Sequence, residues 1–281
     1  MLNVGWAQHA SAVALVMLDL VARTWRIQAL LPIRFRPAFA ATAASDTLAA
    51  VTPARAGGEP VRFARFVNAG MTPASTLAAM AVETLVGGAI LLLGGLAFAM
   101  SSIGRSLVAS QAAAASRLPW WWTVTSVVVL VAVFGLLVRG HWRAIRDNWV
   151  STVRESLRQT ISQPIGRVLM VTWWTLVSFV ARAAILPLLI AGAAGVTPPI
   201  LWMTTVGAVY GLLVAPTPGG VGVVELGFFA TLRRILGVAD VTILLVIWRV
   251  YAYGLSAAIG GIVLIDTWFA KRRDSGAEPE G

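Results

Sequence analysis

The chain has 281 residues, of which 58% are hydrophobic and only 12% are charged. A soluble domain carries about twice that charged fraction, so this chain cannot cover itself with polar surface and is expected to be an integral membrane protein. The chain has 22 lysine and arginine residues and 12 acidic ones. In a membrane protein this positive excess is typical of cytoplasmic loops and does not indicate nucleic-acid binding. The lack of cysteine excludes disulfides and thiolate chemistry.

Five apolar stretches are long enough to cross a bilayer as helices. The first covers residues 2–20 and is expected to be retained, because no positively charged segment precedes it as in a secretory signal. The others are residues 76–100, 120–138, 168–191 and 241–266. We therefore predict an all-α polytopic membrane protein with about five full transmembrane helices. Residues 1–270 would form a single transmembrane domain and residues 271–281 a disordered cytoplasmic tail.

Two further apolar stretches, residues 38–68 and 200–236, are each interrupted by glycine and proline. An arm of about 15 residues rises about 22 Å, short of the hydrocarbon core of about 30 Å. Each stretch is predicted to be a re-entrant hairpin, with a kinked full-length helix as the alternative. If the first helix enters from outside, most cationic residues fall inside. The two hairpins then enter from opposite sides, which indicates an inverted repeat.

Residues 142–161 are predicted to form a cytoplasmic amphipathic helix. Arginines such as Arg154 and Arg158 occur beside Trp149, Val153 and Leu157 in this segment. A helix of this kind lies at the headgroup boundary and attracts anionic lipid. An ordinary cytoplasmic loop is the alternative.

The segment Pro-Thr-Pro-Gly-Gly-Val-Gly-Val-Val-Glu at residues 216–225 is the most informative part of the chain. Its prolines prevent a continuous helix, and its glycines let the backbone approach a ligand closely. The helix that follows would offer free N–H groups to a phosphate, with Glu225 one turn inside it. The alternative is that the glycines serve helix packing and that Glu225 satisfies local N–H groups.

This segment resembles the signature of the lysylphosphatidylglycerol synthase transmembrane region family, also called flippase-like integral membrane proteins. Residues 52–62, Thr-Pro-Ala-Arg-Ala-Gly-Gly-Glu-Pro-Val-Arg, look like its second motif. Arg23-Thr-Trp-Arg26 and Arg249-Val-Tyr-Ala-Tyr253 are similar to two further elements. Members that transfer aminoacyl groups carry a large cytoplasmic domain after the last span, where eleven residues follow here. The resemblance therefore implies lipid movement without lipid lysylation.

Arg182 and Arg249 lie within predicted spans, where a charge costs about 2.5–3.5 kcal/mol at the bilayer centre and needs a partner. The candidate partners are Glu83, Asp46, Glu59 and Glu225. These arginines could form structural ion pairs, or they could bind a lipid phosphate. Tyr253 shares a helix face with Arg249 and could position the same phosphate. The candidate substrate-binding or transport residues are Pro53, Arg55, Gly57, Gly58, Glu59, Arg62, Arg182, Pro216, Pro218, Gly219, Gly220, Gly222, Glu225, Arg249 and Tyr253.

The functional prediction is a lipid flippase or transporter of the cytoplasmic (inner) membrane, with its C-terminus in the cytoplasm. It would move a phosphate-bearing phospholipid or glycolipid. No catalytic residues, metal or cofactor are expected, because no nucleophile has a base and no acidic cluster has ligand spacing. The alternatives are a non-catalytic scaffold for a lipid or cell-envelope polysaccharide synthase, and a lipid-modifying enzyme. The expected partners are lipids with anionic or phosphate headgroups and a separate synthase or glycosyltransferase. An oligomer is also compatible with the sequence. Nucleic acid is excluded as a partner.

Overall fold

A computed structural model describes residues 4–52, 55–101, 105, 142–190, 197, 201, 204–205 and 222–275. This part of the chain is helical and contains no strand, which confirms the predicted all-α fold there. The first half contains α1 (Trp6–Gln28), α2 (Phe35–Val51), α3 (Gly58–Asn68) and α4 (Pro73–Met100). The second half contains α7 (Trp142–Ile161), α8 (Ile165–Leu189), α10 (Val223–Leu236), α11 (Val238–Arg249), the π-helical turn η3 (Val250–Gly254) and α12 (Leu255–Ser275).

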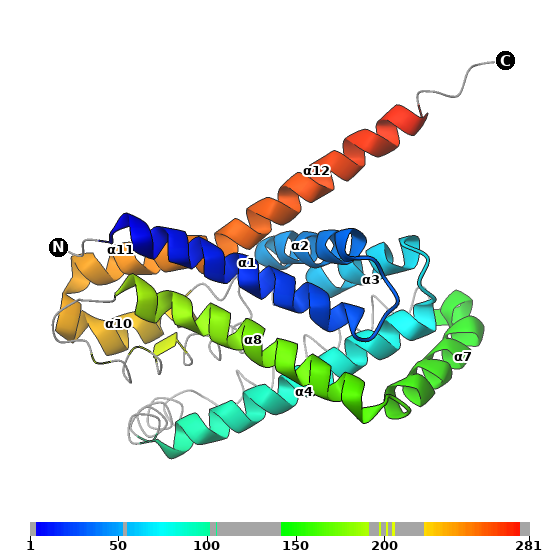
Figure 1. Cartoon of the computed structure of the whole chain (residues 1–281), viewed down its shortest axis with the longest axis horizontal. Coiled ribbons are helices and arrows are strands. Elements are labelled where there is room, and N and C mark those ends of the chain that lie inside the picture. Colours follow the sequence, from blue (N-terminus) through cyan, green and yellow to red (C-terminus); the bar gives the residue numbers. More distant parts are fainter. Residues whose placement is uncertain are drawn as a thin grey trace.

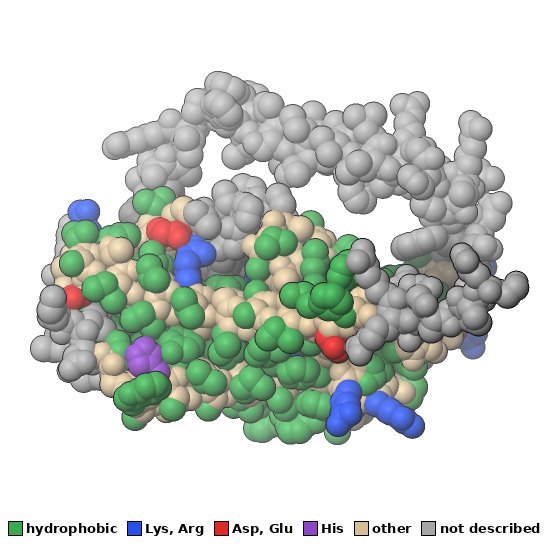
Figure 2. Space-filling view, turned by 90° about the horizontal axis from the view of Figure 1, so that it is seen from above, with side chains coloured by type: hydrophobic (Ala, Val, Ile, Leu, Met, Phe, Trp, Pro, Cys, Tyr) green, Lys and Arg blue, Asp and Glu red, His purple; other side chains and the backbone are tan. Residues whose placement is uncertain are grey.

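Three described helical stretches are long and apolar enough to cross a membrane: Pro73–Phe98, Ile165–Leu189 and Val238–Phe269. They coincide with the predicted spans 76–100, 168–191 and 241–266, whereas the predicted span 120–138 lies outside the described residues. The first predicted span is also helical, but α1 is not among these three stretches. Figure 2 shows hydrophobic side chains over much of the described surface, as a lipid-facing bundle requires.

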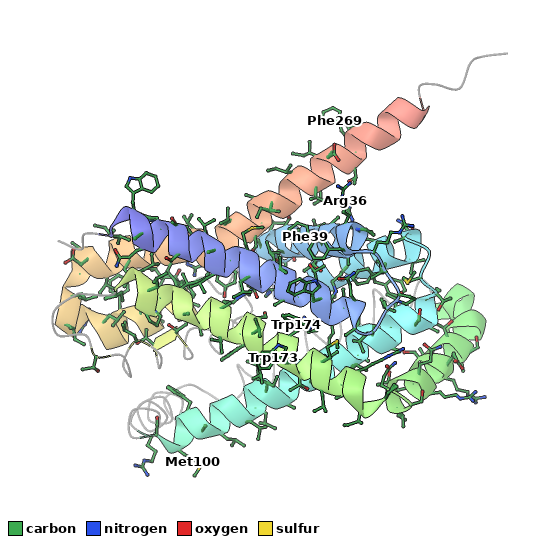
Figure 3. The ribbon with its side chains drawn as sticks, in the orientation of Figure 1. Arg36, Phe39, Met100, Trp173, Trp174 and Phe269 are labelled. Carbon is green, nitrogen blue, oxygen red and sulfur yellow. The ribbon has the colours of Figure 1, made fainter. Side chains whose placement is uncertain are left out.

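Helices α1 and α8 lie side by side and run antiparallel (Figure 1). Near one end, the Gln8 side chain donates a hydrogen bond of 3.1 Å to the carbonyl oxygen of Leu188. Near the other end, the ring of Trp25 lies 4.7 Å from that of Trp174, which Figure 3 labels on α8. The α1–α8 pair therefore lies at the centre of the bundle, and other helices pack against it.

Two apolar clusters occupy the two ends of the α1–α8 pair. One includes Val16 of α1 and Leu186 of α8, with side chains from α10 and α11. The other includes Ile27 of α1 and Val171 of α8, with side chains from α2, α3 and α4. The buried polar residues of α1 and α8, which are Asp19, Thr24, Thr175 and Ser178, fall between these clusters along both helices. The bundle therefore contains a buried polar layer between two apolar cores.

The first predicted hairpin, residues 38–68, is formed by α2 and α3, which pack against each other. The arms have 17 and 11 residues, so the longer one rises about 25 Å. At the turn, the backbone N–H of Gly57 donates a hydrogen bond of 2.9 Å to the hydroxyl of Thr52. A Cβ atom on Gly58 would lie 2.9 Å from the carbonyl oxygen of Ser45. The paired glycines therefore let α3 begin directly against α2.

The antiparallel hairpin places Phe35 and Ala69 at the same end of the α2–α3 pair, which can be tested by labelling. The native chain has no cysteine, so Phe35→Cys and Ala69→Cys can each be studied alone. We expect a membrane-impermeant thiol reagent to reach both cysteines from the same side of sealed vesicles. Labelling from opposite sides would show that residues 38–68 cross the bilayer as one kinked helix.

Only the second arm of the other predicted hairpin, residues 200–236, is described over its full length, as α10. Its tip, residues 216–221, lies outside the described residues, and so does most of its first arm. The inverted repeat therefore stays a prediction. After α10 the chain turns at Gly237, which has a φ of 81°, a conformation that favours glycine. This turn folds α11 back against α10.

The longest described stretch runs from α11 through η3 into α12, which projects beyond the bundle in Figure 1. Its base packs tightly on α2. The Thr47 hydroxyl donates a hydrogen bond of 2.7 Å to the carbonyl oxygen of Ala257, and a Cβ atom on Gly260 would overlap the Ala43 backbone. Small residues on both helices permit this approach, as in many membrane helix pairs. Helix α12 continues to Ser275, five residues into the predicted tail.

Helix α7 has the bounds predicted for the amphipathic helix. This segment is therefore a helix and not a loop. Its exposed residues include Val150, Val153, Leu157 and Ile161, which recur at helical spacing along one stripe. Ser156, a polar residue, is buried instead. The apolar stripe of α7 therefore faces away from the protein.

Candidate functional site

The polar layer between the two apolar clusters is built from ionised side chains, and we call it the charged layer. Its members come from α1, α2, α3, α4, α8 and the turn between α2 and α3. They are Asp19, Arg23, Arg26, Asp46, Arg55, Arg62, Glu83 and Arg182.

Asp19 lies at the centre of one half of this layer and is only 3% exposed. Its carboxylate accepts hydrogen bonds from the Ser178 hydroxyl at 2.5 Å and from the Arg182 guanidinium at 2.6 Å. An Nη atom of Arg23, one turn further along α1, lies 3.0 Å away. A single carboxylate thus holds two arginines from two helices, which compensates the cost of burying it.

Arg23 also joins α1 to α2. Its two Nη atoms donate to the two oxygens of Asp46 at 2.8 and 2.6 Å. This two-bond fork is the strongest geometry between a guanidinium and a carboxylate. Because both of its Nη atoms are used in this way, Arg23 is held firmly inside the bundle.

Arg55 and Arg182 are held more loosely and converge on one aromatic ring. Their Cζ atoms lie 5.7 and 5.8 Å from the centre of the Tyr253 ring. The nearest carboxylate oxygen to Arg55 is that of Asp46, at 3.9 Å. The Arg55 and Arg182 side chains are 31% and 22% exposed, against 13% for Arg23. These two arginines are therefore the more accessible cations of this half.

Glu83 of α4 is the centre of the other half. It pairs with Arg26 of α1 at 2.7 Å and with Arg62 of α3, so it ties three helices together. Glu59 lies 3.6 Å from Arg62, but its side chain is 62% exposed. Glu59 therefore lies at the rim of the charged layer and contributes little to its interior.

Arg249 and Glu225 form a separate pair at 2.5 Å between α11 and α10. The other oxygen of Glu225 accepts a hydrogen bond of 2.6 Å from the backbone N–H of Gly222. Gly222 has a φ of 95°, which explains why a glycine precedes α10. Glu225 thus satisfies a local N–H group, as the packing alternative proposed, and also pairs with the arginine.

The π-helical turn η3 carries two tyrosines, Tyr251 and Tyr253, whose side chains contact different neighbouring elements. The hydroxyl of Tyr251 lies 2.7 Å from Nδ1 of His9 on α1. Tyr253 reaches Arg55 and Arg182, as described above. A π turn has a wider backbone ring than an α turn and is frequent at functional sites. In this protein it lies directly after Arg249, within the Arg-x-x-x-Tyr motif.

A pocket of about 510 Å³ lies apart from the charged layer, between α2, α3 and α12. Arg65, Asn68 and Trp268 are among its lining residues, and no member of the charged layer lines it. Figure 3 labels Phe39 on α2 and Phe269 on α12, two of the helices that contribute lining residues. Within the described ranges, no group of three or more His, Asp or Glu side chains could hold a metal ion.

Comparison with known families gives one finding. A family model described as the lysylphosphatidylglycerol synthase TM region matches residues 2–260. The chain belongs to this family. No curated protein and no solved structure matches it. The family resemblance inferred from residues 216–225 and 52–62 is therefore confirmed, and the chain is a membrane protein of lipid metabolism or transport.

The structure separates the predicted site residues of this family member into several groups. Arg55, Arg62, Arg182 and Tyr253 meet in or against the charged layer. Gly57 and Gly58 form the turn into α3, and Gly222 forms the turn before α10. Glu225 and Arg249 form their own pair, and Glu59 lies at the rim. The other predicted site residues lie outside the described part of the chain: Pro53, Pro216, Pro218, Gly219 and Gly220.

The predicted partner set was right for Arg249 and wrong for Arg182. Arg249 pairs with Glu225, which was among the candidates. Arg182 pairs with Asp19 instead, a residue that was not among the candidate partners. Asp19 lies one turn before Arg23 on α1, and this i, i+4 acid–base spacing was the signal that could have identified it.

Proposed function

We propose that the protein moves a phosphate-bearing phospholipid or glycolipid across the cytoplasmic membrane, with its C-terminus in the cytoplasm. The observation that carries this proposal is an excess of positive charge inside the bundle. In the charged layer, its rim and the Arg249 pair, six arginines meet five carboxylates, and one of these, Glu59, is mostly exposed.

Uncompensated arginine is costly within a membrane, so residues of this kind usually line a substrate or ion pathway. Arg182 and Arg249 lie in stretches that can cross the membrane. A phosphate group suits such a place, because its oxygens accept two parallel hydrogen bonds from one guanidinium. A lipid headgroup would bring the missing negative charge into the bundle and leave with it.

Arg249 has a distinct part in this proposal. In the structure its guanidinium is bound to Glu225, whose other oxygen caps the start of α10. A lipid phosphate that competes for Arg249 would release Glu225 and loosen the contact between α10 and α11. The ion pair would then link headgroup binding to a movement of α10 against α11.

Lipids with anionic or phosphate headgroups are the proposed partners, and a separate synthase or glycosyltransferase could supply or use the lipid. Two alternative functions make different predictions. A scaffold for such an enzyme would leave lipid sidedness unchanged in vesicles that contain this protein alone. A lipid-modifying enzyme would change the mass of the lipid, which mass spectrometry would detect.

The test of transport is lipid sidedness in reconstituted vesicles, measured with fluorescent phospholipids and a membrane-impermeant quencher. We expect the native protein to move phosphate-bearing lipid faster than protein-free vesicles. Arg249→Met should reduce this rate by about tenfold or more, since it removes a charge-assisted contact worth about 1.5–3 kcal/mol. Its thermal stability should change little, because Glu225 keeps its hydrogen bond to Gly222 and partial exposure.

Arg233→Met is the matched control, since Arg233 lies exposed on α10. It removes the same charge without touching the Glu225 pair. If Arg249→Met moves lipid at the rate of Arg233→Met, Arg249 has only a structural role. If the native protein leaves lipid sidedness unchanged, the transport proposal itself is wrong.

A further inference from the structure

The two accessible arginines of the charged layer differ from its other cations in what they bind. Arg23 gives both Nη atoms to Asp46, and Arg26 and Arg62 share Glu83. Arg182 has one contact with Asp19, and Arg55 lies 3.9 Å from Asp46. Arg55 and Arg182 therefore keep donor capacity that the carboxylates of the layer do not use.

The surroundings of this half of the layer carry one surplus positive charge. Among the described residues, the carboxylates within 4 Å of Arg23, Arg55 and Arg182 are those of Asp19 and Asp46. Tyr253 adds a ring face beside both accessible guanidiniums and a hydroxyl that can donate to an oxygen. Guanidinium groups are strong donors to phosphate oxygens, and a phenol can donate one further hydrogen bond.

The backbone of Arg55 supports the same interpretation. Arg55 has a φ of 60° and is the non-glycine residue with positive φ in the described part of the chain. This left-handed conformation is unfavourable for a long side chain and favours glycine or asparagine. Strained residues of this kind cluster at ligand-binding sites, where the side chain is needed at that position.

We propose that Arg55, Arg182 and Tyr253 form a binding site for one singly charged phosphodiester, so that the protein prefers anionic lipids to zwitterionic and aminoacylated ones. This inference rests on the proposed lipid substrate and specifies its headgroup. A phosphodiester with one negative charge neutralises the surplus cation. A choline or lysyl headgroup brings its own positive charge beside the arginines and is repelled by them.

The experiment measures displacement of a fluorescent short-chain phosphatidylglycerol from the full chain in neutral detergent. We expect unlabelled phosphatidylglycerol to compete at about tenfold lower concentration than phosphatidylcholine or lysyl-phosphatidylglycerol. Arg55→Gln should bring the anionic and zwitterionic lipids to similar competing concentrations. Asp46 keeps its fork with Arg23 in this variant, so the bundle should stay folded.

Arg55→Gly removes the guanidinium and also relieves the unfavourable φ of 60°, so a loss of preference in it cannot come from misfolding of the turn. Arg167→Gln, exposed on α8, is the control and should keep the native preference. The inference fails if the native protein binds all headgroups equally, or if both Arg55 variants keep the preference. Inorganic phosphate that competes as well as phosphatidylglycerol would also overturn it, since the site would then take free phosphate.

Failure of this inference and failure of the transport proposal give different results. Selective binding without lipid movement in vesicles would contradict the transport proposal and support the headgroup site. If anionic and zwitterionic lipids bind equally and move at equal rates, the transport proposal is supported and the headgroup site is contradicted.

Discussion

Asp19→Leu is expected to destabilise the protein more than any other replacement of a charged residue in the charged layer. Asp19 is 3% exposed and holds Arg182, Arg23 and Ser178. Its removal leaves two guanidiniums without this carboxylate inside the bundle. Breaking one buried pair in this way costs about 3–5 kcal/mol of folding free energy. We expect a lowered midpoint of thermal unfolding in detergent and a reduced yield of monodisperse protein.

A second variant shows whether the loss comes from charge. Asp19→Leu combined with Arg182→Met removes both partners, so it should recover part of the stability that the single replacement loses. Asp266→Leu, at an exposed position of α12, is the control for loss of one carboxylate and should have little effect. A double variant as unstable as the sum of its two single variants would show that Asp19 and Arg182 do not stabilise each other.

Gly260→Ala is the second change with a large expected effect, although it adds only one methyl group. The new Cβ would overlap the backbone carbonyl of Ala43 and crowd the Thr47 hydroxyl, so α12 would have to move away from α2. Overpacking of this kind costs about 1–3 kcal/mol, and more where the obstructing atom is backbone. The midpoint of thermal unfolding should therefore fall by roughly 2–12 °C.

Gly261 is a matched control for this experiment because it is the next residue on the same helix. A Cβ atom there would meet nothing within 4 Å. Gly261→Ala should be neutral or slightly stabilising, by up to about 1 kcal/mol, since alanine is the better helix former. If both alanine variants unfold at the same temperature, the close crossing of α2 and α12 is not important for stability.

Much of the fold followed from periodicity and composition alone. The three long apolar helices, the amphipathic helix α7 and the turn at Gly57 all fall where the sequence predicted them. These features depend on local rules, because the apolar length sets a span and glycine sets a turn. The family also followed from short motifs, and the match over residues 2–260 confirmed it.

The composition of the candidate site followed only in part. The sequence identified Arg182 and Arg249 as buried cations, since a charge within an apolar run is visible without a structure. It suggested Glu225 for Arg249 but not Asp19 for Arg182. Asp19 and Arg182 are 163 residues apart, and the antiparallel arrangement of α1 and α8 that joins them is set by side-chain packing along both helices.

The sequence by itself determined that this is an arginine-rich helical membrane protein of a lipid-related family, because hydropathy, charge and short motifs are properties of neighbouring residues. Only the tertiary structure decided which carboxylate neutralises which arginine and which arginines keep donors free. It also decided that the backbone widens into a π turn at Val250–Gly254, which brings Tyr253 beside Arg55 and Arg182. These features depend on how separate helices cross, and the free energy of burying charge favours arrangements in which distant partners meet.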